Sequence, residues 1–394
     1  MKKKIADAQR YLQELGADGW LLYDFHRNNE LAHLFLETSL QKHVTRRFFY
    51  WIPAKGEPVR LVHAIESDVL DAWPGEKRRF LSWQSLHEEL RKILTGAKRI
   101  AMEYSPDNAI PYISKVDAGT VDLIRSFGIE VVSSGPFLLR FTSVLTPEQG
   151  HSHIRAGAAL DRVAHETWEW IRERLRKEEP FGEYEVQQQM VRGFEKLGLE
   201  TDSPPIVGVN AHGADPHYAP SKERSSPIRK GDFIQIDLWG KEKKPGSIYA
   251  DIARVGVAAS SATAKQKEIF SVVRRAQKEA IALVRSRFAE KKTLQGWEVD
   301  DAARNVVKKA GFGEFFIHRT GHNIDVNVHG SGTHMDNLEM HDIRPVLPST
   351  CFSIEPGIYL PGEFGVRLES DVYVHPNGNV EIVGGEQNEI VFLV

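Results

Sequence analysis

Acidic residues stand inside apolar segments in the C-terminal half of this chain. Asp237 ends the run Phe-Ile-Gln-Ile-Asp, Glu355 follows Phe-Ser-Ile, and Glu369 follows Gly-Val-Arg-Leu. Such segments form buried strands, where an acidic side chain is costly unless its charge is compensated. Asp251 and His322 extend the set to four carboxylates and one imidazole. Carboxylates brought together repel one another unless they ligate cations, and two divalent ions would balance the four charges. The set therefore predicts a dinuclear metal site.

The spacing of Asp237 and Asp251 predicts two strands joined by a loop. The two residues are fourteen positions apart (251 − 237), with a Lys-rich Pro-Gly turn between them, and we expect Asp237 at the end of its strand. A lone Asp there is more often a turn or capping residue, but the Glu residues downstream favour the metal site. His322 alone also suits a structural role. Because His329 follows at an odd offset of seven (329 − 322), a turn or bulge must separate the histidines if both line one pocket.

Length and composition exclude several classes of protein. At 394 residues, with 41% hydrophobic and 27% charged residues, the chain reads as a soluble globular protein of two domains. A net charge of −3 gives no basic surface for nucleic acid, and no apolar run approaches the roughly 20 residues that span a bilayer. The start reads as an amphipathic helix rather than a signal peptide. The single cysteine, Cys351, fits a reducing cytosol and reads as a buried, inert thiol. We expect a cytoplasmic protein.

Residues 1–145 are predicted to form an α/β domain. Strand-like stretches at 19–23, 47–52, 58–63, 99–103 and 129–132 alternate with helical ones at 86–94 and 121–127, and the second and third strands read as a hairpin. The aromatic run Phe48 to Trp51 favours a core strand over a ligand platform. This part of the sequence contains no recognisable phosphate loop or catalytic cluster.

Residues 146–394 are predicted to form an α+β domain that contains the whole acidic set. Thr146-Pro147-Glu148-Gln149 has the pattern of a helix start, and a long helix should follow over 148–177. Further amphipathic helices are expected at 184–197, 264–288 and 297–310, with strand-rich pieces between and after them. Helices flanking a predominantly antiparallel sheet account for this pattern.

Five ordered motifs closely resemble those of the pita-bread metallopeptidases. They are the Asp237 and Asp251 pair, Thr320-Gly321-His322, the segment from Asn210-Ala211 to Pro216-His217, Glu355-Pro356-Gly357-Ile358-Tyr359, and Gly365-Val366-Arg367-Leu368-Glu369. One such motif alone is weak evidence of a relationship, whereas chance agreement of five ordered motifs is improbable. The branch that the chain resembles is the Xaa-Pro peptidases, which comprise prolidase (Xaa-Pro dipeptidase) and aminopeptidase P. The resemblance covers residues 146–394, and the N-terminal domain is similar in size and position to the creatinase-type domain of that branch.

The resemblance implies a role for each residue of the set. Asp237 and Asp251 would bind one metal, His322 and Glu355 the second, and Asp251 and Glu369 would bridge both. Oxygen-rich ligation with one imidazole suits Mn²⁺, with Co²⁺, Fe²⁺ or Zn²⁺ as alternatives. Glu355 would also carry a proton from the metal-bridged hydroxide nucleophile to the leaving nitrogen. His217 and His329 would hold substrate and stabilise the oxyanion, and Arg367 would brace a ligand carboxylate.

Three details depart from the pattern of that family. Gly321-His322-Asn323-Ile324-Asp325 stands where the family commonly has Gly-His-Gly-Ile-Gly, and Val328-His329-Gly330 stands where it has Val-His-Glu. The loop between Asp237 and Asp251 is about three residues longer than the resemblance suggests. No ligand is removed, so these changes bear on substrate preference. His341 and Arg344 are candidates to meet a substrate carboxylate, and Asp336 reads as part of a solvated loop.

The expected function is hydrolysis of Xaa-Pro bonds in dipeptides by a metal-dependent homodimer. The short connection between Glu355 and Glu369 (369 − 355 = 14) resembles the compact prolidase form and favours a dipeptidase. Three alternatives stay open: an Xaa-Pro aminopeptidase acting on longer peptides, a metal-free creatinase-like hydrolase, and a non-enzymatic pseudo-peptidase that binds a partner. The last two predict missing ligands, and all five ligand positions are filled here.

Overall fold

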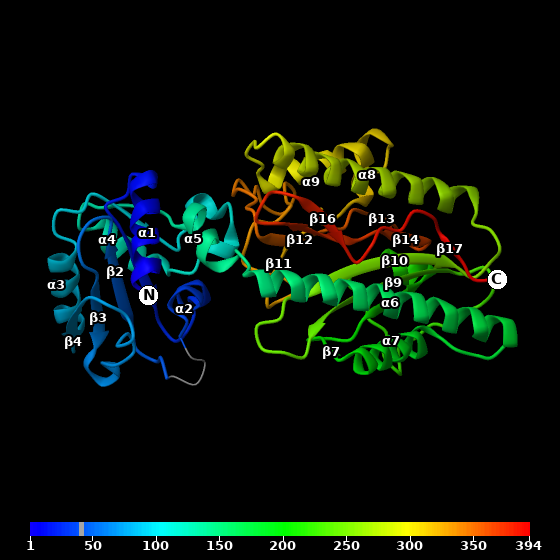
Figure 1. Cartoon of the computed structure of the whole chain (residues 1–394), viewed down its shortest axis with the longest axis horizontal. Helices are drawn as coiled ribbons and strands as arrows, with labels where there is room; N and C mark the ends of the chain where they lie inside the picture. Colours follow the sequence, from blue (N-terminus) through cyan, green and yellow to red (C-terminus); the bar gives the residue numbers. More distant parts are fainter. Residues whose placement is uncertain (39–42) are drawn as a thin grey trace. The chain divides into compact units, whose positions relative to one another are not determined.

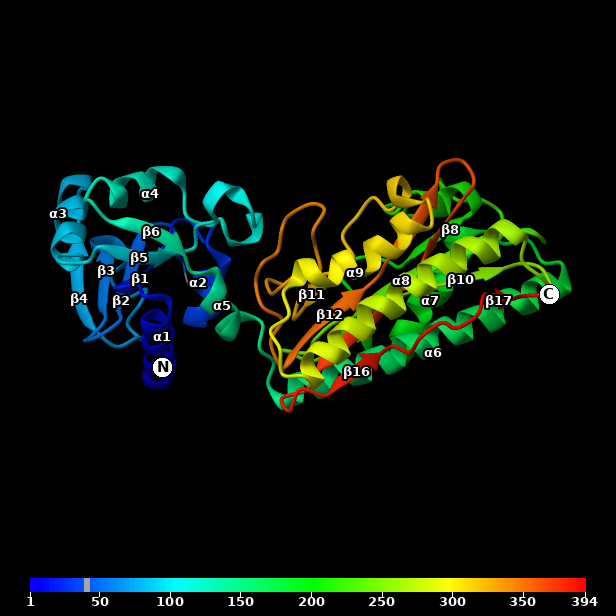
Figure 2. The same ribbon diagram turned by 90° about the horizontal axis from the view of Figure 1, so that it is seen from above.

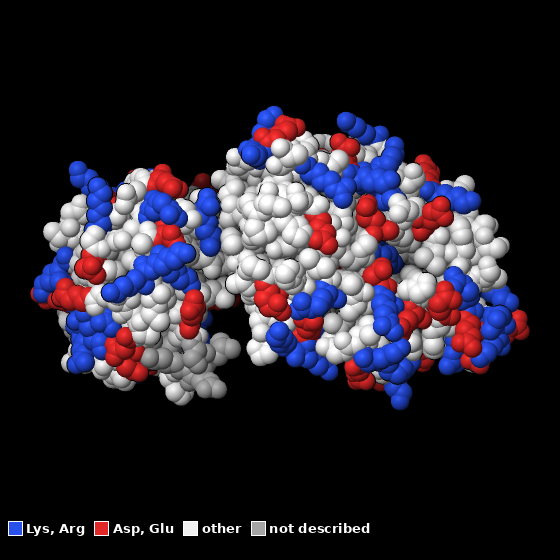
Figure 3. All heavy atoms as spheres, in the orientation of Figure 1, with Lys and Arg blue, Asp and Glu red and all other residues white. Residues whose placement is uncertain are grey.

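The computed structural model describes residues 1–38 and 43–394 and divides the chain into two compact units, Met1–Thr142 and Ser143–Val394 (Figure 1). The division lies three residues before the boundary expected at 145 (145 − 142). On the face in Figure 3, acidic and basic side chains of the described residues are interspersed over each unit. Among the described residues, no helix has both the length and the apolar character needed to cross a membrane.

The first unit is built on a six-stranded sheet with the order β4-β3-β2-β1-β5-β6. Its strands are β1 (Gly19–Asp24), β2 (Phe48–Pro53), β3 (Val59–His63), β4 (Glu76–Phe80), β5 (Arg99–Met102) and β6 (Glu130–Ser133). Its helices are α1 (Lys2–Leu15), α2 (Glu30–Leu36), α3 (Trp83–Ile93), α4 (Ala118–Arg125) and α5 (Gly135–Thr142). Strand β2 is antiparallel to β1 and β3, whereas β4, β5 and β6 pair in parallel with their neighbours. The expected hairpin of β2 and β3 is confirmed.

Burial explains why the aromatic segment forms the middle of this sheet. Phe48, Phe49 and Tyr50 are fully enclosed on β2, and Trp51 is buried beside them. Strand β1 is buried along its whole length and pairs with β2 residue by residue. Both faces of these central strands are covered, which fits the nearly continuous apolar sequence. The prediction of a core strand at Phe48 to Trp51 is confirmed.

The second unit places strands between two pairs of helices (Figures 1 and 2). Helices α6 (Pro147–Lys177) and α7 (Glu183–Leu197) lie on one side, and α8 (Ala264–Ala289) and α9 (Gly296–Lys309) lie on the other. The strands are β7 (Leu199–Glu200), β8 (Ile206–Val209), β9 (Phe233–Glu242), β10 (Ala250–Val257), β11 (Asn323–Ile324), β12 (Thr350–Ile354), β13 (Gly357–Leu360), β14 (Phe364–Arg367), β15 (Ser370–Val374), β16 (Val380–Val383) and β17 (Val391–Phe392).

The strands of this unit form three sheets. One has the order β17-β10-β9-β7 with β8 also paired to β9, the second has the order β11-β12-β15-β16, and β13 pairs with β14. Helix α6 packs against β9 and β10, while α8 packs against β12, β13, β14 and β16. The helix start at Thr146 is confirmed, since its hydroxyl accepts the Gln149 amide in a capping box. The expected α+β architecture is confirmed.

The position expected for Asp237 within its strand is wrong. Strand β9 runs from Phe233 to Glu242, so Asp237 is its fifth residue and not its last. The strand continues because Leu238, Trp239 and Gly240 pair with Ile252, Asp251 and Ala250 of β10. Apolar patterning alone does not distinguish a strand end from a buried polar residue inside a strand.

Candidate metal centre

The β9–β10 hairpin places Asp237 and Asp251 on one face. Asp237 is opposite Ala253 in the antiparallel register, and Asp251 is two residues before Ala253. Side chains directly opposite one another, and those two residues along a strand, point to the same side of a sheet. Both carboxylates are 6% exposed. The hairpin therefore presents two buried carboxylates as diagonal neighbours.

Glu355 and Glu369 come from the adjoining sheet and also face each other. Strands β12 and β15 pair in a register that sets Ile354 opposite Ser370, so the next residues outward are Glu355 and Glu369. The Glu369 amide donates to the Ala253 carbonyl oxygen (3.2 Å), which ties it to the Asp251 strand. The Glu355 amide donates to the Thr320 carbonyl oxygen (2.7 Å), beside the segment of His322. These backbone bonds bring all five residues to one place.

His322 presents a lone pair to the carboxylates. Its Nδ1 lies 3.2 Å from the carbonyl oxygen of Asn323 and donates to it, so the proton resides on Nδ1 and Nε2 is unprotonated. Nε2 lies 3.4 Å from Glu355 Oε1 and 3.7 Å from Asp251 Oδ2. A lone pair facing ionised carboxylate oxygens is repulsive unless a cation lies between them. Nitrogen and oxygen atoms of Asp251, His322 and Glu369 lie within 4.8 Å of one another.

Three buried carboxylate oxygens lack a hydrogen bond among the described residues. They are Oδ1 of Asp237, Oδ1 of Asp251 and Oε1 of Glu369. Buried polar atoms are nearly always paired in folded proteins, and the exceptions require an explanation such as an ion. The donor set of carboxylate oxygens with one imidazole nitrogen suits divalent ions such as Mn²⁺ or Fe²⁺. The residues present therefore fit a divalent metal centre.

The electrostatics of the cluster agree with that fit. Burial raises the pKa of Asp251 and of Glu369 well above the usual value. The charge of Asp237 raises that of Asp251 further, and the charge of Asp251 raises that of Glu369. Burial also raises the pKa of Glu355 to about 7. Burial lowers the pKa of His322 well below its usual value. Without cations the carboxyl groups would hold protons, so metal binding and proton release are coupled.

Arg367 braces Asp237 and lines the same cavity as the five clustered residues. Its guanidinium hydrogen-bonds to Asp237 Oδ2 and to the Tyr359 hydroxyl (3.2 Å), and its amide donates to Gln235 Oε1 (2.8 Å). Arg367 is buried. Because the guanidinium takes Oδ2, the remaining oxygen, Oδ1, is the one left for a cation.

The five residues line one cavity of about 330 Å³, whose rim carries His217 and His329. The ring of His329 stands perpendicular to that of His322, with centroids 4.3 Å apart. Burial lowers the pKa of His329, and the charge of Arg319 lowers it further, so its imidazole is neutral at neutral pH. The segment between the histidines is non-helical and turns, as their odd spacing requires.

The structure does not bring His341 or Arg344 into this cavity. Arg344 is buried and gives its Nε and Nη2 to Asp342 at 2.8 and 2.6 Å. His341 is exposed and hydrogen-bonds to Asn337 (2.7 Å). Neither residue is among those that line the cavity. The expectation that Asp336 lies in a solvated loop is wrong, because Asp336 is fully buried and accepts the amides of Leu338 and Glu339.

Sequence reasoning missed three residues around the cluster. Asp371 is fully buried, and its Oδ2 accepts the Asp251 amide at 2.8 Å, which positions that carboxylate. Asp202 and Trp239 line the cavity, where the indole donates to Asp202 Oδ1 (2.8 Å). Asp371 carries the signal that identified Glu369, an acid within an apolar strand. Asp202 stands in a Ser-Pro loop and offers no such signal.

Comparison with known proteins agrees with this geometry. The sequence pattern of metallopeptidase family M24 matches residues 152–376, which include the five clustered residues and both rim histidines. The chain belongs to metallopeptidase family M24. The M24 chain is 32% identical to an Xaa-Pro dipeptidase of Lactobacillus helveticus over 242 residues, which are 61% of this chain and 60% of that protein. It is 30% identical to a probable dipeptidase PepE of Mycobacterium tuberculosis over 260 residues, 66% of this chain and 64% of that one.

The M24 chain also resembles solved structures over its whole length. A dipeptidase PepE from Mycobacterium ulcerans aligns with a TM-score of 0.71 at 24% identity, covering 100% of this chain and 97% of that one. A prolidase from Thermococcus sibiricus aligns with a TM-score of 0.65 at 20% identity, covering 99% and 98%. These likenesses show the fold. The chain matches 52% of the length of an uncharacterized peptidase of Staphylococcus saprophyticus, and 60% and 64% of the lengths of the two dipeptidases named above.

Proposed function

We propose that this M24 protein is a metal-dependent exopeptidase that hydrolyses Xaa-Pro bonds. The observation that carries the proposal is the buried cluster of Asp237, Asp251, His322, Glu355 and Glu369, with three carboxylate oxygens left without hydrogen bonds. The relatives named Xaa-Pro dipeptidase and dipeptidase support the choice of substrate. The complete ligand set argues against a metal-free hydrolase or a binding module on the same fold.

Two divalent cations are the proposed cofactors, with Mn²⁺ first and Co²⁺, Fe²⁺ or Zn²⁺ as alternatives. Asp237 and Asp251 would hold one ion and His322 and Glu355 the other, with Asp251 and Glu369 shared. Such ions lower the pKa of water and polarise a carbonyl group, which supplies a nucleophile near neutral pH.

The remaining chemistry belongs to the side chains of the cavity. Glu355 accepts a hydrogen bond from the Ser353 hydroxyl (3.2 Å), which fixes its carboxylate at the cavity floor, where it can move a proton to the leaving nitrogen. His217 and His329 line the cavity, where their imidazoles would hold the peptide and donate a hydrogen bond to the developing oxyanion. The tertiary prolyl nitrogen has no N–H, so its release depends on proton delivery.

A dipeptide is the proposed substrate, on the names of the relatives and the short connection between Glu355 and Glu369. One observation favours a second candidate, an aminopeptidase acting on longer Xaa-Pro peptides. Among the described residues that line the cavity, Arg367 is the one with a permanent positive charge, and it is already paired with Asp237. The C-terminal carboxylate of a dipeptide therefore finds no free guanidinium or ammonium in this cavity. A longer peptide does not need one.

We also propose an oligomeric state and a cellular location for the protein. A homodimer is expected from the family resemblance, and sedimentation of the purified chain tests it. A cytoplasmic location rests on the single buried Cys351, whose environment shows no disulfide partner among the described residues. Short proline-containing peptides would then be its partners in the cytosol.

The test is peptide hydrolysis by the chelated and the Mn²⁺-loaded protein. Ala-Pro, Ala-Pro-Ala and Ala-Ala are compared as substrates, with Glu369→Gln as the site variant and Glu363→Gln as the matched control. Glu363 is exposed and pairs with Lys265 at the surface. We expect metal-dependent cleavage of the two Pro substrates, lost in Glu369→Gln and kept in Glu363→Gln. Faster cleavage of Ala-Pro-Ala would select the aminopeptidase. Absence of cleavage of both Pro substrates by the metal-loaded protein would overturn the proposal.

A further inference from the structure

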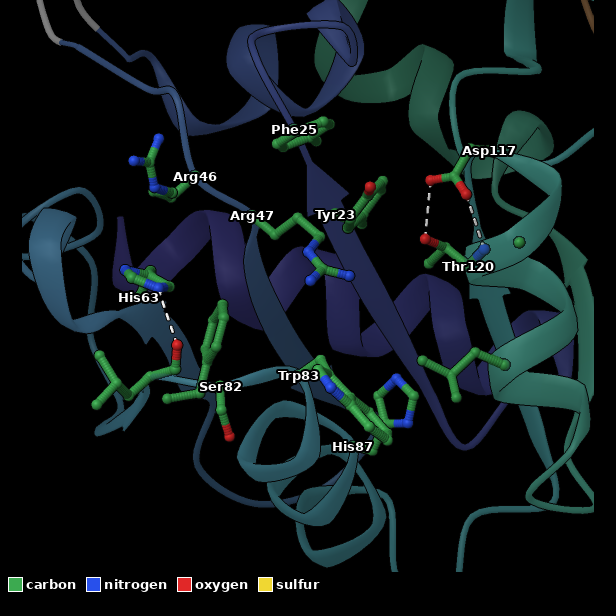
Figure 4. Close-up of a pocket in the computed structure, with 14 residues that line it drawn as sticks. Tyr23, Phe25, Arg46, Arg47, His63, Ser82, Trp83, His87, Asp117 and Thr120 are labelled. Atoms are coloured by element: carbon green, nitrogen blue, oxygen red, sulfur yellow. Dashed lines mark hydrogen bonds between the residues drawn. The ribbon is translucent and has the colours of Figure 1, made fainter.

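A second cavity, of about 770 Å³, lies within the first unit, at the end of its sheet where several strands reach their carboxyl ends (Figure 4). Strands β1, β3 and β4 run in the same direction and end at Asp24, His63 and Phe80, so their carboxyl ends meet at this end. Tyr23, His63 and Phe80 line the cavity. In open α/β sheets, ligands bind in the crevice outside the carboxyl ends of the strands. The place and the volume of this cavity are those of a small-molecule site.

Arg47 supplies a charge without a counterion. It stands just before β2, is half-buried, and extends into the cavity between Tyr23 and Trp83 (Figure 4). Its charge lowers the pKa of both Tyr23 and His87, although burial dominates each shift, so the guanidinium is close to both. Among residues 1–38 and 43–394, Arg47 has neither a hydrogen-bond partner nor an ion-pair partner. A half-buried guanidinium presents five donors, and an anion satisfies them best.

The other polar groups of the cavity are already engaged. Asp117 accepts the amide and the hydroxyl of Thr120 (both 2.8 Å). His63 accepts the Ile65 amide on Nδ1 and donates from Nε2 to the Leu81 carbonyl oxygen. Both nitrogens of His63 are therefore occupied in the neutral ring. Arg46 also lines the cavity, but its guanidinium hydrogen-bonds to the Thr45 hydroxyl (3.0 Å), so Arg47 is the lining cation without a partner among the described residues.

An apolar wall faces this cation. Phe25 is 40% exposed, Trp83 is 61% exposed and Leu81 is 73% exposed, although all three are large apolar side chains. Single exposed apolar residues are ordinary, but three gathered around one cavity mark a binding surface. The ring of His87 lies 5.4 Å from that of Trp83 and is uncharged at neutral pH, because burial lowers its pKa. The indole face is thus open to a planar ligand.

We propose that this cavity binds a small aromatic ligand that carries a phosphate or a carboxylate group. The anion pairs with Arg47, and the aromatic ring packs against Trp83. Guanidinium pairing with an anion and stacking on an indole are both favourable when partly desolvated. A nucleoside phosphate and a peptide ending in an aromatic residue share this chemistry. The site lies in the first unit and is independent of the proposed peptidase activity.

Calorimetric titration of the full chain tests the proposal with four probes. Adenosine monophosphate and N-acetylphenylalanine carry the anion, while adenosine and N-acetylphenylalaninamide are their uncharged counterparts. We expect saturable one-to-one binding of at least one charged probe, at least about tenfold tighter than its uncharged counterpart. Binding of the phosphate probe alone assigns a phosphate ligand, and binding of the other alone assigns a carboxylate ligand.

Three variants locate the binding. Arg47→Gln should weaken binding about tenfold or more, and Trp83→Ala should weaken it through loss of the stacking surface. Arg79→Gln is the matched control, since Arg79 is exposed on neighbouring β4 and does not line the cavity. Because Trp83 is exposed, its removal leaves the core intact, and an unchanged melting temperature checks this.

Several results would overturn the proposal. The proposal is overturned if neither charged probe binds at millimolar concentration. It is also overturned if Arg47→Gln and Trp83→Ala leave the binding affinity unchanged. Inorganic phosphate binding as tightly as adenosine monophosphate would refute the aromatic part. A dimer that dissociates in Arg47→Gln and Trp83→Ala would show that a second copy of the chain occupies the surface instead.

Discussion

The carboxylate of Asp325 lies in the space that a side chain at position 330 would need. A Cβ atom added to Gly330 would stand 2.7 Å from Asp325 Oδ2 and 2.3 Å from Asn323 Oδ1. Asp325 accepts the amides of Asn327 (2.7 Å) and Ser331 (3.1 Å), and so holds both ends of the loop that carries His329. The two departures from the family pattern, Asp325 and Gly330, are therefore one structural arrangement.

Gly330→Ala should damage the reaction without removing a metal. The added methyl group must displace Asp325 or Asn323, which shifts the loop of His329 at a cost of about 1–3 kcal/mol of overpacking. We expect a lower kcat/KM for Xaa-Pro substrates with unchanged metal content, measured by steady-state kinetics and elemental analysis. Asp325→Asn should show the same pattern more mildly, because the amide keeps one acceptor oxygen. Wild-type kinetics in Gly330→Ala would contradict the coupling.

His329→Ala should lower activity through the substrate and not through the metals. The imidazole is at the rim of the cavity and next to His322, where it can donate to a developing oxyanion. Loss of one such donor costs about 10²–10³ in kcat. The control is His341→Ala, which lies outside the cavity and should retain wild-type kinetics. Equal losses in both variants would refute the role of His329.

Arg367→Met should weaken metal binding. Removal of the guanidinium leaves Asp237 Oδ2 without its partner in a buried site, so the carboxylate loses both its orientation and its charge balance. Loss of a group that orients a metal ligand typically costs about 10- to 100-fold in metal affinity. Equilibrium dialysis against Mn²⁺ measures this directly. An affinity equal to that of the wild type would show that Arg367 does not support the site.

The carboxylates of the metal centre should stabilise the metal-free protein less as the pH rises from about 4 towards 7. Folding raises the pKa of Asp251 and Glu369 well above the ordinary carboxyl value of about 4, and that of Glu355 to about 7. Through these three groups the folded chain holds protons that the unfolded chain has released in this window, so their contribution to the free energy of unfolding falls with increasing pH. Melting temperatures of the chelated protein at pH 5 and pH 7 test this.

Two comparisons sharpen that experiment. Added Mn²⁺ should raise the melting temperature more at pH 7 than at pH 5, because the cations replace the protons. Glu369→Gln removes one buried charge, so the metal-free variant should depend less on pH than the metal-free wild type. The same pH dependence of the melting temperature in the chelated wild type and in chelated Glu369→Gln would contradict the electrostatic account.

The sequence reveals the buried carboxylates but not how they are paired. Glu355 and Glu369 could be identified because an acid in an apolar segment is costly unless its charge is compensated. Arg344 was misjudged because its carboxylate partner, Asp342, lies two residues away in a loop whose conformation has no periodic signal. Asp371 escaped notice because its partner is a backbone amide 120 residues distant (371 − 251), a contact that only the fold creates. Local patterns predict helices and strands and reveal which charged side chains are buried. Long-range contacts decide which partner compensates each buried charge.

The most direct test of the metal centre is a titration of the chelated protein with Mn²⁺, followed by bound metal and Xaa-Pro hydrolysis in the same samples. The account predicts two ions bound per chain in the wild type, fewer in Glu369→Gln, and hydrolysis that rises with occupancy. Undiminished hydrolysis by the chelated protein would contradict it, as would a wild-type chain that binds no Mn²⁺.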